Sequence, residues 1–328
     1  MSHGNSVLDL RATGPPHERA ERTGPVIDRA EYERVHVILG RPERSIDVDE
    51  PLAALRDERI VVTGASGGIG RALVALLAGT GIEVCATDVD TLDVTVGRDF
   101  ARLRAATLVF HLAAEKDACA GEVLPERALL VNAVGTANIL ASGVRTVFAS
   151  TCKAASPETV YGASKLIGER LTLNAGGAVA RLFNVCDSPR NVFETWAALP
   201  SHEPIPVTEC TRYFISSREA VALLLWSAAL AGGRYAIADA VPRTMRDVAA
   251  ALYPGRAVRT IPRRRGDRAR EPFCAPNEMA GAEIVPGIIR IESAHDAPAP
   301  DRARAGHDAR HRSLERYAAT GALRIATR

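Results

Sequence analysis

The sequence lacks the features that mark several classes of protein. Its longest apolar run, at residues 220–231, is too short to span a bilayer and is interpreted as a buried helix, and the first thirty residues show no signal peptide. The six cysteines include no Cys-x-x-Cys pair, which argues against a zinc site or a disulfide scaffold and fits a reducing cytoplasm. The net charge is only +2, so no general affinity for nucleic acid or membranes is implied. We therefore expect a soluble, cytoplasmic protein with no bound metal and no nucleic-acid or membrane partner.

The chain does contain a regular alternation of strands and helices from Arg59 onward. Short apolar segments typical of buried strands occur at residues 59–64, 83–88, 107–114, 145–150 and 178–183. The alternation predicts an α/β fold, a doubly wound parallel Rossmann sheet with a smaller C-terminal substrate-binding lobe. We expect five regions: a flexible N-terminal arm (1–34), a docking segment (35–57), the cofactor-binding Rossmann domain (58–183), a mixed substrate-binding lobe with returns to the Rossmann sheet (184–294) and a polar basic tail (295–328).

A glycine-rich turn follows the first of these strands. Gly64, Gly67 and Gly70 stand in TGASGGIG, where glycine lets the backbone turn tightly and approach a pyrophosphate at the helix N-terminus. Asp88, at the end of the next strand, is placed to accept hydrogen bonds from ribose hydroxyls. No arginine follows Asp88 immediately to bind a 2′-phosphate, so NAD is favoured over NADP. A purely structural turn with a solvated aspartate is the alternative.

The same reasoning extends the predicted cofactor site to neighbouring residues. Asp93 and Val94 are candidates for the adenine pocket. The remaining candidates for cofactor contact are Ser66, Gly68 and Ile69 in the turn, and Leu112, Ala113 and Ala114 at the end of the strand at 107–114.

A second segment, STCKAASPETVYGASK at residues 150–165, carries groups suited to redox chemistry on a sugar. The preceding strand delivers Thr151 to the edge of the sheet where open α/β folds bind ligands. Tyr161 and Lys165 are four residues apart, so a helix places them on one face. A nearby ammonium and the positive cofactor ring would lower the pKa of Tyr161, making it a usable base for a sugar hydroxyl. The alternative is a surface Tyr and Lys on an ordinary helix.

The chain resembles the extended short-chain dehydrogenases and, within them, the bacterial nucleotide-sugar 4,6-dehydratases. The resemblance covers roughly residues 35–290, and the spacing from STCK to YGASK and the late TRYF motif are specific to this branch. It is carried by ILGRP, TGASGGIG, VFHLAAEKDA, VNAVGTANIL, STCKAASPETVYGASK, RLFNV and TRYFISSREAV.

The resemblance implies oxidation of the sugar at C4, loss of the C5 proton and the C6 hydroxyl, and return of the hydride. Tyr161 would be the base for oxidation, Lys153 a candidate base at C5 and residue 152 the acid. The chain departs from the family pattern in three ways. Cys152 stands where relatives usually have Asp, Tyr161 stands where many membrane-bound relatives have Met, and the interval from Asp88 to Asp93 is short.

The thiol of Cys152 has three interpretations. It could donate a proton to the leaving hydroxyl, because a thiol with a reference pKa of about 8.5 is protonated at neutral pH. The hydride could then return to C6, or to C4 leaving an exocyclic enol ether. Cys152 could instead be silent in a 4-epimerase, or it could be a small residue that packs at a strand end. Retention of Lys153 favours elimination.

Further residues are candidates for contact with the sugar or its diphosphate. The candidates are Glu115, Lys116, Asn184, Arg190 and Arg212. The first three are chosen by their position in the fold and family, and the two arginines because guanidinium binds phosphate well. His111 and Asn132 are interpreted as core and packing residues. We expect a small-molecule nucleotide-sugar or nucleoside substrate and a possible homodimer. A catalytically inactive NAD-binding protein is the non-enzymatic alternative, against which Thr151, Tyr161 and Lys165 argue together.

Overall fold

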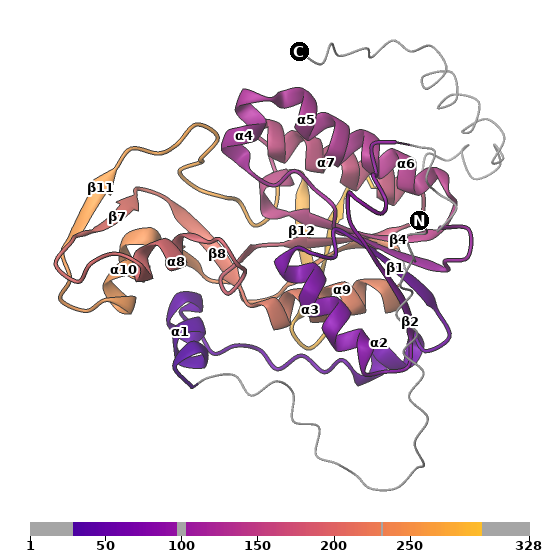
Figure 1. The fold of residues 1–328 in the computed structure, drawn as a ribbon, viewed down its shortest axis with the longest axis horizontal. Helices are drawn as coiled ribbons and strands as arrows, with labels where there is room; N and C mark the ends of the chain where they lie inside the picture. The colour runs from indigo at the N-terminus through magenta and orange to yellow at the C-terminus, as the bar shows by residue number, and fades with distance from the viewer. Residues whose placement is uncertain (1–28, 97–102, 231, 297–328) are drawn as a thin grey trace, which may run out of the picture.

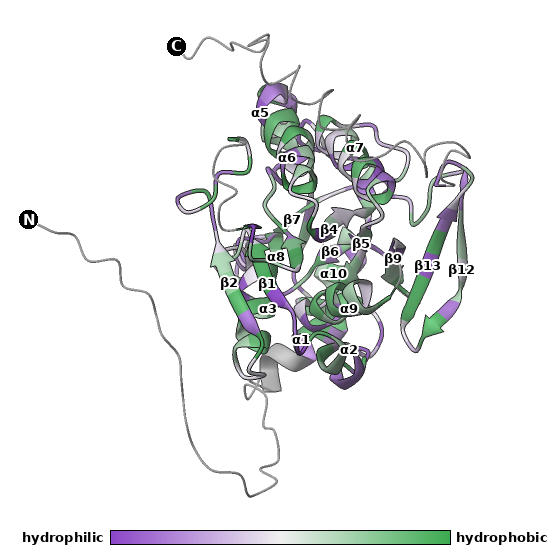
Figure 2. Cartoon of the chain, turned by 90° about the vertical axis from the view of Figure 1, so that its right-hand side faces the viewer, coloured by the Kyte–Doolittle hydropathy of each residue, from purple (hydrophilic) through white to green (hydrophobic). Residues whose placement is uncertain are grey.

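An eight-stranded sheet forms the centre of the molecule. The computed structural model describes residues 29–96, 103–230 and 232–296. The sheet has the order β12-β13-β9-β5-β4-β3-β1-β2. Its six parallel strands are β1 (Arg59–Thr63), β2 (Glu83–Thr87), β3 (Leu108–His111), β4 (Arg145–Thr151), β5 (Ala178–Leu182) and β9 (Gly233–Ile237). The antiparallel hairpin of β12 (Glu278–Val285) and β13 (Ile288–Ser293) extends one edge (Figure 2).

Helices cover both faces of this sheet (Figure 1). One layer contains α2 (Asp49–Ala54), α3 (Gly68–Ala78) and α9 (Ser217–Ala229). The other contains α4 (Ala118–Val123), α5 (Pro125–Leu129), a π-helical turn (Leu130–Val134), α6 (Gly135–Ala141) and α7 (Val160–Asn174). The central strands are buried on both faces, because their apolar runs meet a helical layer on each side. The prediction of a doubly wound parallel Rossmann sheet is confirmed.

A smaller lobe follows β5 along the chain. It is built from the sheet β10-β8-β6, the two-stranded parallel sheet β11-β7 and two helices. Their bounds are β6 (Asn184–Val185), α8 (Val192–Ala197), β7 (Ile205–Thr208), β8 (Thr211–Ile215), β10 (Pro242–Thr244), α10 (Met245–Leu252) and β11 (Val258–Ile261). Trp196 and Phe193 lie at its core, edge to face with ring centroids 5.5 Å apart.

Helix α1 (Arg29–Leu39) packs on the small lobe rather than on the central sheet (Figure 1). Its Ile38 and Leu39 are buried in the same core as Trp196. The sequence predicts a flexible arm up to residue 34, whereas the helix already begins at Arg29. Apolar packing against α10 and β8, which lie more than 170 residues away, accounts for the difference, because no local signal announces it.

A segment between α1 and α2 links the small lobe to the central sheet. Arg41 donates two hydrogen bonds to the buried carboxylate of Glu219 at the start of α9, at 2.6 and 3.0 Å. Glu219 also completes a capping box with Ser216. This segment therefore docks on the helix that covers the sheet.

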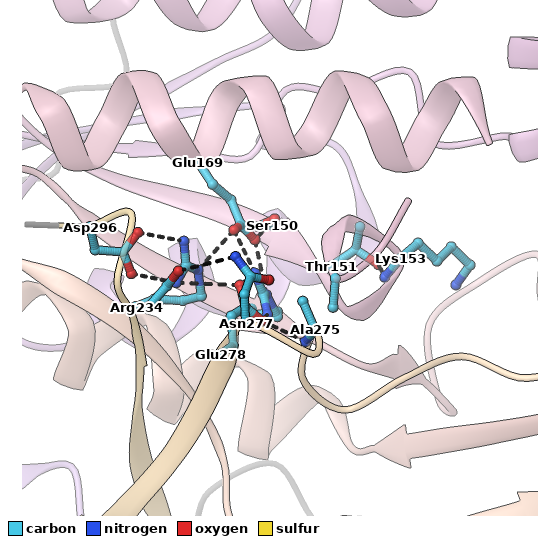
Figure 3. A network of polar contacts seen from close by, with 12 residues as sticks. Ser150, Thr151, Lys153, Glu169, Arg234, Ala275, Asn277, Glu278 and Asp296 are labelled. Carbon is cyan, nitrogen blue, oxygen red and sulfur yellow. Dashed lines mark hydrogen bonds and ion pairs between the residues drawn. The ribbon is translucent and has the colours of Figure 1, made fainter. Parts of the chain in front are cut away.

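A buried ionic network ties the C-terminal hairpin to helix α7 (Figure 3). Glu169 of α7 pairs with Arg181 of β5 at 2.6 Å and with Arg234 of β9 at 2.8 Å, and all three side chains are fully buried. Arg181 also pairs with Glu278 at 2.5 Å, and Arg234 with Asp296 at 2.7 Å. The predicted basic tail lies outside the described residues except for residues 295 and 296. Within the described ranges, no helix has the length and apolar character required to cross a membrane.

Candidate active site

The turn after β1 leaves no room for side chains at its glycines. Gly64 has a φ of 67°, and a Cβ there would lie 2.7 Å from the backbone nitrogen of Ala113. A Cβ on Gly70 would lie 2.5 Å from the carbonyl oxygen of Gly64. Gly67 caps helix α3, and Gly68 is its first residue. The backbone can therefore approach a dinucleotide pyrophosphate at the helix N-terminus, so this turn fits the predicted cofactor.

Asp88 lies at the end of β2, beside the glycine-rich turn. Its carboxylate accepts hydrogen bonds from the backbone nitrogens of Ser66 at 3.0 Å and Val89 at 2.9 Å. Burial raises the pKa of Asp88, but the hydrogen bonds from Ser66 and Val89 outweigh it and hold the pKa below its usual value. The side chain is thus an anionic acceptor next to the turn, as recognition of ribose hydroxyls requires.

The remaining predicted cofactor residues lie near this turn or behind it. Ala113 follows β3 and donates its backbone N–H to the hydroxyl of Thr63 at 3.2 Å, with Leu112 and Ala114 on either side of it in the chain. Val94 is buried, and a Cβ on Gly135 would lie 2.7 Å from its side chain, so Val94 packs against the start of α6. The adenine-pocket role of Asp93 and Val94 stays a prediction, as does that of Ile69.

Thr151 and Tyr161 meet where β4 ends and α7 begins. Thr151 is the last residue of β4, and a short 3₁₀ turn, Cys152–Ala154, follows it. The side chain of Thr151 lies close enough to Tyr161 to lower its pKa, against the larger effect of burial. Gly162 allows the approach, because a Cβ there would collide with the carbonyl oxygen of Lys153. The structure therefore brings together the hydroxyl pair that the sequence predicts.

Lys165 lies one turn after Tyr161 and is almost completely buried. Its Nζ is 4.0 Å from the centroid of the Phe148 ring. Burial lowers the pKa of Lys165 to about 7, although Glu169 opposes this. Nearby His111 is fully buried between the hydroxyls of Thr63 and Thr136, and burial lowers its pKa to about 3. His111 is therefore a neutral core residue, as expected from its apolar flanks.

Lys153 forms an ion pair that the sequence did not predict. Its Nζ lies 2.9 Å from Oε1 of Glu271 and donates to Oδ1 of Asn184 at 3.1 Å. Burial lowers the pKa of Lys153, but the charge of Glu271 more than compensates and holds the pKa above its usual value. Burial raises the pKa of Tyr161, and the positive charge of Lys153 opposes this increase. The sequence predicted Lys165 for that position.

Cys152 is enclosed and faces the same carboxylate. Its side chain is fully buried, and the thiol donates a hydrogen bond to Oε2 of Glu271 at 3.2 Å. Burial, together with the negative charge of Glu271, raises the pKa of Cys152 to about 12. These contacts argue against the predicted role of Cys152 as the proton donor, because the thiol has no exposed surface from which to reach a substrate.

The predicted substrate residues divide into two groups. Asn184 and Arg212 lie at the Lys153 cluster, where Asn184 donates to Oε2 of Glu271 at 2.8 Å and Arg212 pairs with Oε1 at 3.0 Å. Arg190 and Lys116 are exposed and stand apart from it. Glu115 pairs with Arg127 at 2.8 Å.

Asn132 supports the site from behind, as predicted. It accepts from the backbone nitrogen of Glu115 at 2.8 Å and donates to Ser164 of α7 at 3.0 Å. Within the described part of the chain, no group of three His, Cys, Asp or Glu side chains could hold a metal ion.

Glu271 is the site residue that sequence reasoning missed. It follows the arginine-rich stretch RRRGDRAR at 263–270, a pattern typical of a solvated basic loop. In the structure Arg268 of this stretch is mostly buried and donates to the carbonyl oxygen of Ser156 at 2.9 Å and to Glu158 at 2.6 Å. The only signal in the sequence is an acidic residue directly after the last of these arginines and before the apolar Pro-Phe-Cys.

Comparison with known proteins places this geometry in a family. A family model described as polysaccharide biosynthesis protein matches residues 88–293. The chain is 27% identical to the probable polysaccharide biosynthesis protein EpsC of Bacillus subtilis, over 76% of the chain and 50% of that protein. It is 30% identical to the inverting UDP-N-acetylglucosamine 4,6-dehydratase of Campylobacter jejuni (serotype O:2), over 53% of the chain and 59% of that enzyme. It thus spans about half the length of these curated relatives.

The fold also matches solved structures. The crystal structure of Pen from Bacillus thuringiensis superposes with a TM-score of 0.63 at 20% identity, covering 73% of this chain and 88% of that one. The family model and the dehydratase relative confirm the resemblance that the sequence motifs indicate. Because the family model covers more than half of the 328 residues, the chain belongs to the polysaccharide biosynthesis protein family.

Proposed function

We propose that this protein is an NAD-dependent enzyme that removes water from the sugar of a nucleotide sugar or nucleoside. NAD, when bound at the glycine-rich turn and Asp88, would supply the oxidant at C4 and later return the hydride. The observation that carries the proposal is the Lys153 ammonium, held 2.9 Å from Glu271 next to the Thr151–Tyr161 pair. The site thus contains a proton donor separate from the group that would serve oxidation.

Tyr161 and Thr151 are suited to the oxidation step. Tyr161 would accept the proton of the C4 hydroxyl, and Thr151 would hold the same oxygen by a hydrogen bond. The positive charge of Lys153 favours the phenolate of Tyr161. Asn184 and Arg212 flank the cluster and would contact the sugar or diphosphate, with Arg190 as a more distant candidate.

Lys153 is better suited to act as an acid than as a base. As a base it would first have to pass its proton to Glu271, although the pKa of Lys153 lies above 10.5 and that of Glu271 below 4.5. That transfer runs against both shifts and therefore adds to the barrier. One fifth of the Lys153 side chain is exposed, whereas Cys152 is fully buried. Lys153 is thus the group placed to protonate the departing C6 hydroxyl. The C5 proton, made acidic by the ketone at C4, would pass to solvent, from which Lys153 regains its own proton.

A 4-epimerase is the second candidate. Burial of Cys152 favours it, because residue 152 is then unable to act as an acid on the substrate. Epimerisation needs Tyr161 and a turn of the ketosugar but no second proton donor. It therefore leaves the ion pair of Lys153 without a chemical role, and for this reason we rank it second. A homodimer stays a prediction.

The test is mass spectrometry of the purified protein with NAD and a panel of nucleotide hexoses and nucleosides in heavy water. Loss of one water with deuterium at C5 in a C6-methyl product supports 4,6-dehydration. Loss of water with an exocyclic alkene shows return of the hydride to C4. An unchanged mass with an inverted C4 centre would show an epimerase. Tyr161→Phe should abolish all of these reactions, and a protein that only binds NAD would show no reaction in either form.

A further inference from the structure

We infer that Glu271 is a positioning residue that fixes Lys153 as an ammonium ion at the site. The role of that ammonium in dehydration rests on the proposed function. Its charge state is a property of the protein and can be measured without any substrate. Glu271 lies 118 residues after Lys153 in the chain, on a different lobe, and the family match assigns it no role.

The contacts of Glu271 leave little freedom to its carboxylate. Oε1 lies 2.9 Å from Lys153 Nζ and 3.0 Å from Arg212 Nε. Oε2 accepts from Cys152 Sγ at 3.2 Å and from Asn184 Nδ2 at 2.8 Å. Both oxygens are therefore engaged, and the side chain of Glu271 is fully buried. Because it has no exposed surface, Glu271 acts through Lys153 rather than on a substrate.

The charges around Lys153 make this one carboxylate decisive. Glu271, Cys152 and Tyr161 are the titratable groups that act on Lys153, and Arg212 is the second cation at the carboxylate. In the ligand-free chain Cys152 and Tyr161 are neutral at physiological pH, because burial raises the pKa of both. Glu271 is thus the anion that balances two adjacent cations. Without it, burial and the charge of Arg212 would both favour a neutral Lys153.

The segment that carries Glu271 is anchored on the catalytic segment itself. Arg268 donates to the carbonyl oxygen of Ser156 at 2.9 Å and pairs with Glu158, so it holds the loop between Lys153 and Tyr161. Gly266 has a φ of 82°, and a Cβ there would lie 2.6 Å from the carbonyl oxygen of Ala118 at the start of α4. The position of Glu271 is therefore set by packing on both sides of the site.

The composition of the chain makes the inference easy to test. Only three of its 41 basic residues are lysines, namely Lys116, Lys153 and Lys165. Lys116 is exposed and serves as an internal reference for an ordinary amine. The protein is treated with trace acetic anhydride at a series of pH values, and mass spectrometry of its peptides measures how far each lysine is acylated. The pH dependence of acylation gives the pKa of each amine. The measurement uses the full ligand-free chain.

We expect Lys153 in the wild-type protein to become reactive at a higher pH than Lys116. In Glu271→Gln, which keeps the shape and removes the charge, the midpoint for Lys153 should fall by about 2 pH units or more. Glu209→Gln, which removes an exposed carboxylate paired with Arg246, should leave it unchanged. A wild-type Lys153 that reacts at or below the midpoint of Lys116 would overturn the inference, and so would an unchanged midpoint in a folded Glu271→Gln.

The wild-type titration stands even if Glu271→Gln fails to fold, and Glu271→Asp then provides the variant that retains the charge. Activity gives a second, separate reading. On a substrate found by the panel, Glu271→Gln should slow water loss about 100-fold, which is within the range for loss of one general acid, while bound NAD is still reduced. If Lys153 titrates as expected but no sugar loses water, the charge assignment holds and the proposed dehydration fails. If water is lost equally fast in both proteins, Glu271 has no role in positioning the acid.

Discussion

Glu169→Gln is the substitution that should most clearly destabilise the fold. Glu169 lies in the middle of α7, four residues after Lys165, and is fully buried. Its Oε1 accepts from Ser150 at 2.6 Å and from Arg181 Nε at 3.0 Å, and its Oε2 pairs with Arg181 at 2.6 Å and Arg234 at 2.8 Å. The amide keeps the volume of the side chain but removes the negative charge between two buried guanidinium groups.

The expected loss is about 3–5 kcal/mol in the free energy of unfolding, because removing one member of a buried ion pair leaves uncompensated charge. Glu278 and Asp296 remain as partners of Arg181 and Arg234, so the lower part of that range applies. At about 2 °C per kcal/mol for a domain of this size, Tm should fall by roughly 6–8 °C. Ser150→Ala, which removes one neutral hydrogen bond to the same carboxylate, should cost about 1 kcal/mol.

Urea unfolding followed by circular dichroism at pH 7 measures these differences. Burial raises the pKa of Glu169, but Arg181 and Arg234 outweigh it and keep the pKa below its usual value. The stabilisation by Glu169 is therefore present above its unfolded pKa of about 4.3 and is lost as the pH falls through the lower folded value. The gap between wild type and Glu169→Gln should close in acid. A loss below about 1 kcal/mol at pH 7, or a gap that does not change with pH, would refute this reasoning.

Three further predictions concern the cofactor site and the catalytic helix. Burial lowers the pKa of Lys165 from 10.5 to about 7, so the stability of the protein rises with pH between these two values. Lys165→Met should raise the Tm of the ligand-free protein at pH 7 and flatten the rise of stability with pH. A lower Tm in this variant would contradict the prediction. Asp88→Asn should weaken NAD binding in calorimetry by about 10-fold or more through loss of a charged acceptor, and equal affinity would argue against its ribose contact. Gly64→Ala should destabilise the protein to urea by more than about 1 kcal/mol because of its positive φ and the nearby Ala113 nitrogen, whereas a neutral effect would show that the turn can shift.

The Rossmann half of the molecule could be predicted because its signals are local. The apolar run of β1, the glycines of the turn and Asp88 follow one another within thirty residues, and each has one ready explanation. Parallel strands buried on both faces give continuous apolar runs, so the strands at 145–151 and 178–182 were also found. The pairing of Thr151 with Tyr161 follows from the same local logic, because both lie at the end of one strand and the start of the next helix.

The C-terminal half could not be predicted in the same detail. Strand β12 is largely exposed along its length and carries no alternation of apolar and polar residues. Its place at the sheet edge depends on β13 and on the ion pair of Glu278 with Arg181, 97 residues earlier in the chain. Arginine and glutamate in a strand or helix are usually interpreted as exposed residues. Such long-range pairing of buried charges leaves no mark on local sequence.

The position of Glu271 also explains what the thiol of Cys152 does. A carboxylic acid at position 152, as the family resemblance leads one to expect, would lie beside the carboxylate of Glu271, and repulsion between the two would raise its pKa. Such a group is protonated at neutral pH and can still give up its proton, as a general acid must. A thiol in the same place has a pKa raised to about 12 and no exposed surface from which to reach a substrate. It still donates a hydrogen bond to Glu271, which leaves that carboxylate free to pair with Lys153. The exchange of Asp for Cys is therefore compatible with the proposed elimination, in which the neighbouring ammonium would be the proton donor and Glu271 would maintain its charge.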